Sequence, residues 1–117
     1  MVKNKRELGK QKESLACELL KQNGYQIIEQ NFSCRLGEID IIAKDGKYLV
    51  FVEVKYRKNT ENGYGFEAVD AKKQSKIKNT SLYYLTTKKK SIDIPVRYDV
   101  IEIIDKVYRI QKDAFSF

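Results

Sequence analysis

The spacing of apolar residues alternates along the chain between a helical period and a strand period, and this predicts the order of the elements. Residues 5–23 have the apolar period of an α-helix, and Gly24 ends the segment as glycine does just beyond a helix C-terminus. The apolar stripe of this helix consists of Leu8, Leu15 and Leu19, widened by Ala16 and Leu20. The later segments are strands at 25–32, 38–43 and 48–56, a helix over about 67–86, and strands at 96–104 and 107–110. The predicted order is α-β-β-β-α-β-β, and a chain of 117 residues fits one α/β domain, residues 1–117.

A tight hairpin is predicted where the second and third strands meet. Asp45-Gly46 is the dipeptide that best supplies two residues of positive φ for a two-residue turn. If Lys44 pairs with Lys47 across this turn, two further pairs face each other: Asp40 with Phe51, and Glu38 with Glu53.

The two faces of this hairpin differ in charge. Because side chains alternate along a strand, one face carries three carboxylates and one ammonium group, from Glu38, Asp40, Glu53 and Lys55. The other face is apolar, with Ile39, Ile41, Ala43, Val50, Val52 and Val54. Crowded carboxylates destabilise one another without a cation. We therefore predict a divalent metal ion held by Asp40 and Glu53, with Lys55 beside it; a turn of odd length would move Asp40 to the opposite face.

Two sequence blocks resemble a known family. Asp40 followed by Glu53-Val54-Lys55 resembles the D...(D/E)-x-K signature of restriction-endonuclease-like nucleases. The blocks G-E-I-D-I-I-A at 37–43 and F-V-E-V-K-Y-R at 51–57 are similar to the YraN-like family of small bacterial proteins, which is related to archaeal Holliday junction resolvases. The resemblance implies a restriction-endonuclease-like fold with a mixed β-sheet flanked by helices.

The same resemblance implies a function. It suggests hydrolysis of phosphodiester bonds in DNA with Mg²⁺ or Mn²⁺ as the cofactor, with branched or junction DNA as a candidate substrate and a homodimer as a candidate assembly. The expected roles are metal ligation by Asp40 and Glu53, and positioning or polarisation of the attacking water by Lys55.

The resemblance also adds residues outside the hairpin. Residues 9–16 resemble the G-x-x-G-E-x-x-A opening of the family, in which the helix glutamate belongs to the active site; this makes Glu13 a further metal ligand and catalytic candidate. By its pattern alone Glu13 reads as solvent-facing, and Lys12 stands where the family often has glycine. Arg57, Lys73 and Gln74 are expected phosphate contacts, with a plain surface glutamine as the alternative for Gln74.

Composition limits the chemistry further. The chain has no histidine, which excludes Ser-His-Asp and Cys-His mechanisms and histidine-based metal nucleases. Its net charge of +7 favours an anionic partner such as nucleic acid. Cys17 and Cys34 form no C-x-x-C motif and indicate reduced thiols. With neither a signal peptide nor an apolar run of membrane length, we expect a cytoplasmic protein without a membrane partner.

Two other classes of function remain at this stage. One is a nucleic-acid-binding module that keeps the nuclease fold with little or no catalytic turnover. The other is a scaffold protein whose basic surface serves solubility. Residues 58–66, rich in asparagine and glycine, are expected to form a loop that faces substrate, or else a plain connector.

Overall fold

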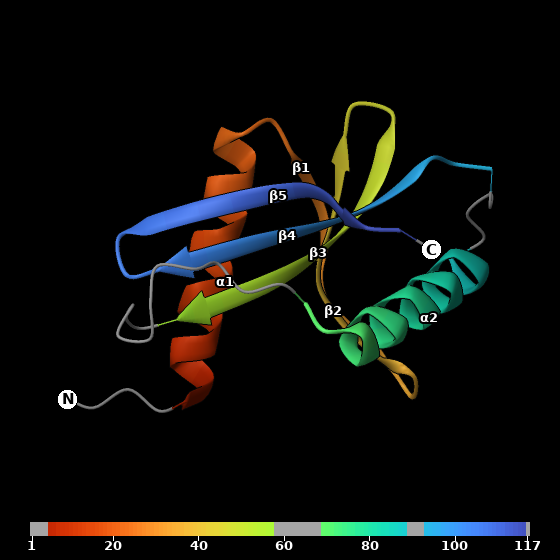
Figure 1. Ribbon diagram of the computed structural model, residues 1–117, viewed down its shortest axis with the longest axis horizontal. Coiled ribbons are helices and arrows are strands. Elements are labelled where there is room, and N and C mark those ends of the chain that lie inside the picture. The colour runs from red at the N-terminus through yellow and green to blue at the C-terminus, as the bar shows by residue number, and fades with distance from the viewer. Residues whose placement is uncertain (1–4, 58–68, 89–92, 117) are drawn as a thin grey trace.

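The chain folds into a five-stranded mixed β-sheet with one helix on each face (Figure 1). The computed structural model describes residues 5–57, 69–88 and 93–116, with side chains from residue 11 onwards. The elements are α1 (Lys5–Gln22), β1 (Gln26–Cys34), β2 (Gly37–Asp45), β3 (Tyr48–Arg57), α2 (Ala71–Thr87), β4 (Val96–Ile104) and β5 (Val107–Phe115). The α/β class and the predicted order α-β-β-β-α-β-β are confirmed.

The strands lie in sequence order, β1-β2-β3-β4-β5, and one central pair is parallel. β3 and β4 run in the same direction, from Leu49 opposite Val96 to Arg57 opposite Ile104, and α2 lies between them in the chain. All other neighbouring strands are antiparallel. A parallel pair needs a crossover connection, and the second helix provides it.

Each helix covers its own core. The core under α1 contains Ala16, Cys17, Leu20, Tyr25, Ile41, Ala43, Val50, Val52, Ile101 and Ile103. The core under α2 contains Ile39, Ile42, Leu49, Phe51, Val69, Ile77, Tyr84, Leu85, Tyr98 and Val100. Among the described residues, neither helix has the length and apolar character needed to cross a membrane.

The buried faces of the two helices differ in part from simple apolar stripes. In α1 the contact face is rotated by about one residue, so that Cys17 is buried and Leu15 is 43% exposed. In α2, Leu82 is 41% exposed, while Thr80 and Ser81 are buried. Both hydroxyl groups donate to carbonyls of the preceding turn, and this satisfies them inside the core. Apolar periodicity cannot find such positions.

The predicted hairpin register is wrong by two residues. Asp45 pairs with Tyr48, so the turn consists of Gly46 and Lys47 instead of Asp45 and Gly46, and only Gly46 has a positive φ, +60°. Asp45 is held in the strand because its carboxylate pairs with Arg97 at 2.7 Å and with Lys112 at 3.1 Å. An even slip by itself keeps side chains on their predicted faces, and this holds from Ile41 to Ala43.

That register changes the predicted partners. Phe51 lies opposite Ile42, and not opposite Asp40. The apolar face is also not continuous, because Ile39 belongs to the α2 core while Ile41 belongs to the α1 core. The face to which the apolar side chains of β2 point thus changes between Ile39 and Ile41. This change occurs level with Asn31 of β1, whose φ of +57° interrupts the regular strand.

A buried polar network joins β4 to its neighbours under α1. Asp99 is fully buried and accepts hydrogen bonds from the Tyr25 hydroxyl at 2.5 Å and from Arg97 at 2.8 and 2.9 Å. The backbone N–H of Asp113 also donates to Asp99 at 2.9 Å. Asp113 lies at an irregularity of β5 and has a φ of +55°. Beyond it β5 continues to Phe115, past the predicted end at residue 110. Burial and the Asp99 hydrogen bond raise the pKa of Tyr25.

Gly37, at the start of β2, lies close to α2. Its φ is +151°, and a Cβ atom there would lie 2.9 Å from Thr80 Oγ1. We expect Gly37→Ala to lower the free energy of unfolding by about 1–3 kcal/mol in urea denaturation. Gly24→Ala is the matched control, because Gly24 also has a positive φ but nothing lies within 4 Å of its added Cβ. Equal losses in the two variants would show that the approach to Thr80 is unimportant.

Candidate active site

Asp40 lies where the β2–β3 ladder ends. The last backbone pair is Ile41 with Val52, and beyond it Asp40 Oδ2 accepts a hydrogen bond from the backbone N–H of Val54 at 2.9 Å. The Asp40 carboxylate thus accepts a hydrogen bond that a backbone carbonyl of β2 would accept in a continuous ladder. The carboxylate therefore sits between the two strands, next to the backbone of the Glu53-Val54-Lys55 segment.

The electrostatic environment of Asp40 is that of a crowded carboxylate. Burial raises its pKa to about 7, and repulsion from Glu53 adds to the rise, with smaller contributions from Glu38 and Glu13; the hydrogen bond from Val54 opposes it. The predicted candidates Glu13, Asp40 and Glu53 therefore lie within electrostatic reach of one another. Such a group is stabilised by any cation that reaches it.

Glu53 already has a cation partner. It is 5% exposed, and its Oε1 lies 2.5 Å from Nζ of Lys73 in the first turns of α2. The hydrogen bond to Glu53 raises the pKa of Lys73. Lys73, expected to contact phosphates, is thus also an internal partner of a proposed metal ligand.

Lys55 and Arg57 point to the same sheet face and share a carboxylate that the sequence analysis missed. Glu102 of β4 is 2% exposed; its Oε2 lies 4.0 Å from Lys55 Nζ, and its Oε1 lies 3.8 Å from Arg57 Nε. The signal in the sequence was an acidic residue inside an apolar run, Val-Ile-Glu-Ile-Ile at 100–104. A charged residue in such a run is rarely buried unless it is paired.

The remaining candidates lie at the edge of this group. Glu13 is half-buried on α1 and accepts a hydrogen bond from Asn31 Nδ2 at 2.8 Å. Gln74 donates from Nε2 to the carbonyl of Val69 at 2.8 Å, so its amide holds the backbone that precedes α2. The predicted substrate-facing loop at 58–66 lies outside the described residues.

The donor set is compatible with a hard divalent cation, although it is not a closed metal site. In the described part of the chain, no three His, Cys, Asp or Glu side chains are gathered closely enough to hold an ion. The carboxylate oxygens of Asp40 and Glu53 are the donors that Mg²⁺ and Mn²⁺ prefer, and burial together with repulsion from Glu53 raises the pKa of Asp40. In this arrangement Lys73 contacts one oxygen of Glu53, Oε1.

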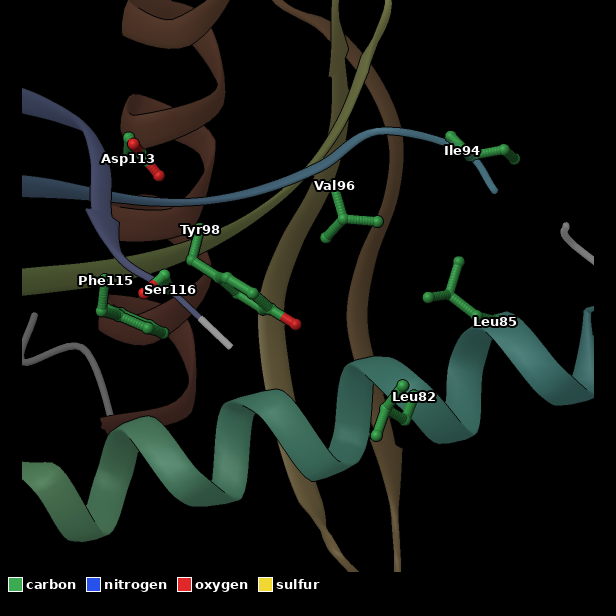
Figure 2. Close-up of a pocket in the computed structure, with 8 residues that line it drawn as sticks. All are labelled: Leu82, Leu85, Ile94, Val96, Tyr98, Asp113, Phe115 and Ser116. Carbon is green, nitrogen blue, oxygen red and sulfur yellow. The ribbon is translucent and has the colours of Figure 1, made fainter. Parts of the chain in front are cut away.

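A cleft lies away from these carboxylates, between α2 and the strands β4 and β5, and its volume is about 250 Å³. Figure 2 shows its lining, which includes the apolar side chains of Leu85, Val96 and Phe115. Asp113 is the only acidic residue among the described residues that line it. Among the described residues that line this cleft, none is a carboxylate or lysine of the candidate site.

The raised pKa of Asp40 predicts a pH dependence of stability. An unfolded aspartate ionises near pH 4, whereas folded Asp40 keeps its proton to about pH 7. Unfolding therefore releases a proton between pH 4 and 7, and Asp40 makes the free energy of unfolding fall as pH rises, by at most about 1.4 kcal/mol per pH unit. Asp40→Asn should remove this slope in urea denaturation between pH 4.5 and 8.

The control for this experiment is Asp105→Asn, in the exposed turn after β4, where the original slope should persist. The lowered pKa of Asp45, caused by its hydrogen bond from Arg97, changes stability only below about pH 4 and lies outside the window. An unchanged slope in Asp40→Asn would contradict the burial and repulsion described above.

The fold and site together define a small α/β protein with an acidic and lysine-bearing site on its central strands. Residues 12–103 match the family described as "Uncharacterised protein family UPF0102". The chain belongs to this family, the YraN-like family that its 37–43 and 51–57 blocks resemble.

Full-length relatives agree with this assignment. A UPF0102 protein of Lachnoclostridium phytofermentans is 46% identical over 113 residues, covering 97% of this chain and 96% of the relative. One of Caldicellulosiruptor saccharolyticus is 46% identical over 100 residues, covering 86% and 84%. One of Thermodesulfovibrio yellowstonii is 47% identical over 109 residues, covering 93% and 96%.

Proposed function

We propose that this protein is a metal-dependent nuclease that hydrolyses phosphodiester bonds in DNA. The observation that carries the proposal is the crowding of Asp40 by other carboxylates, with Lys55 two residues beyond Glu53 on the same strand. This is the arrangement expected from the resemblance to restriction-endonuclease-like proteins. It brings acidic ligands and a cation together on the central strands β2 and β3.

The residues have distinct roles in this proposal. Asp40 and Glu53 would hold Mg²⁺ or Mn²⁺, with Glu13 contributing from the side of α1. When bound, the ion would supply positive charge at the phosphoryl oxygen and the attacking water. Lys55 positions that water and balances the negative charge that develops at phosphorus. The water gives a proton to bulk solvent as its oxygen bonds to phosphorus, and the leaving sugar oxygen takes a proton from solvent as its bond to phosphorus breaks.

Basic residues near the site supply a path for the DNA backbone. Lys72, Lys73 and Lys76 are exposed in the first half of α2, and Lys73 contacts Glu53 directly. When a cation occupies the carboxylates, Lys73 is released and can bind a phosphate instead. Arg57 extends the same positive surface along β3.

The test is cleavage of labelled linear duplex, single-stranded, flapped and four-way-junction DNA by the pure protein. We expect products with Mg²⁺ or Mn²⁺ and none with EDTA. Size-exclusion chromatography of the same sample, with light scattering, asks whether the active species is the homodimer that symmetric junction cleavage requires. Absence of cleavage on all four substrates with either metal would exclude the nuclease.

A second candidate is a DNA-binding module without turnover. It is favoured by the ion pair of Lys73 with Glu53, which neutralises a proposed metal ligand without any metal. In that case DNA binding should not need a divalent ion, and log affinity should fall linearly with log salt concentration, because bound phosphates release counterions. A scaffold protein would have little DNA affinity at any salt concentration.

A further inference from the structure

Glu102 connects the two cations on β3 from the neighbouring strand. In the parallel β3–β4 register Glu102 lies directly beside Lys55, and the side chains point to the α2 face of the sheet. Its two oxygens are divided between partners, Oε2 toward Lys55 Nζ at 4.0 Å and Oε1 toward Arg57 Nε at 3.8 Å. The side chains of these cations are 19% and 22% exposed, whereas that of Glu102 is 3% exposed.

A carboxylate at this depth needs its cations. Removing a charge from water is costly unless partners compensate for it, and Glu102 has two cations within 4.0 Å. The cations in turn lose freedom, because lysine and arginine side chains would otherwise sample many rotamers. The carboxylate therefore fixes the direction of two long side chains that end at the surface.

The carboxylates on this face have separate cations. Glu53 is paired with Lys73 from α2, and Glu102 is paired with Lys55 and Arg57. Glu53 is the carboxylate two residues from Lys55 on the same strand, so Glu102 on β4 is a second, separate carboxylate partner for this lysine.

We propose that Glu102 is a positioning residue, which holds Lys55 and Arg57 side by side so that both face the phosphate of the bound nucleic acid. In this proposal Glu102 acts through these two side chains and not by direct contact with the substrate. The inference rests on the proposed function for its effect on catalysis. The pairing of Glu102 with Lys55 and Arg57, which we call the tether, can be measured without any activity.

The test uses Glu102→Gln, which preserves shape and removes the charge. The ¹H–¹⁵N spectrum reports the Nε–Hε group of Arg57, assigned by its loss in Arg57→Lys. We expect this resonance to shift in Glu102→Gln, because the negative charge 3.8 Å from Nε is removed. In the cleavage assay we expect kcat to fall about 10- to 100-fold, as for residues that orient metal-site groups, with little change in KM.

Asp99→Asn is the matched control, because Asp99 is a second fully buried carboxylate of β4 but pairs with Arg97 on the α1 side. It should lower stability without moving the Arg57 resonance. If Glu102→Gln does not fold, Arg57→Met makes the same test, and the ¹³C resonance of the Glu102 carboxyl group must then move.

The outcomes separate this inference from the proposed function. An active protein whose Arg57 resonance and kcat are unchanged by Glu102→Gln would overturn the positioning role and leave the nuclease standing. An inert wild-type protein whose Arg57 resonance still moves would remove the nuclease and retain the tether. A shift of the same size in Asp99→Asn would show a general loosening of β4, and it would also overturn the role.

Discussion

Lys55→Ala is expected to reduce DNA cleavage by about 10²- to 10³-fold, the usual cost of removing a group that stabilises charge in a transition state. The physical reason is that Lys55 is the cation nearest along the strand to the Glu53 carboxylate, and in the proposed mechanism it faces the phosphate under attack. DNA binding should change little, because a single lysine contributes about one of many phosphate contacts. Single-turnover cleavage and fluorescence anisotropy measure the two effects separately.

Lys106→Ala is the matched control for this variant, since Lys106 lies in the exposed turn between β4 and β5. Asp40→Asn should lose cleavage to at least the same extent and should also lose any stabilisation of the fold by Mg²⁺ or Mn²⁺. Cleavage at the wild-type rate by Lys55→Ala would eliminate the proposed mechanism. A contaminating nuclease would be recognised by equal activity in all variants.

Asp99→Ala is expected to lower the free energy of unfolding by about 3–5 kcal/mol, because it leaves the half-buried Arg97 guanidinium without its principal partner. The substitution also removes the acceptor of the Tyr25 hydroxyl and of the Asp113 N–H. Urea denaturation measures the loss, and the near-ultraviolet circular dichroism of the tyrosines checks that the folded state is retained.

Asp45→Ala provides the comparison for Asp99→Ala. Asp45 also pairs with Arg97, at 2.7 Å, but its side chain is 21% exposed, so water replaces the lost contact and the loss of stability should be much smaller. Equal effects of the two substitutions would mean that burial of Asp99 does not determine the strength of the network.

The order of elements could be predicted because apolar periodicity reports which face of each element is buried. The ends of the strands are harder to predict from the sequence. β5 continues past residue 110 because Asp113 adopts a positive φ and donates its N–H to Asp99, and this long-range hydrogen bond leaves no periodic signal. The hairpin register likewise depends on the pairing of Asp45 with Arg97, 52 residues away.

Only those candidate residues whose placement follows from a local sequence pattern could be predicted. Asp40, Glu53 and Lys55 follow from strand alternation, and Glu13 from the resemblance of the first helix. Glu102 and the pairing of Lys73 with Glu53 depend on the parallel crossover, which places β4 and α2 against β3. No local pattern specifies which distant residue lies next to a given strand position.

The hydrogen bond from the Val54 amide to Asp40 makes this one proton a built-in reporter. Its chemical shift senses whether the accepting oxygen is charged, protonated or drawn toward a metal ion. Titration of uniformly ¹⁵N-labelled protein with acid, Mg²⁺ or DNA would therefore follow the state of the carboxylate without a label in the site. The Val54 amide resonance would therefore report protonation, metal binding or DNA binding at Asp40 directly, whereas an assay of product formation detects only their result.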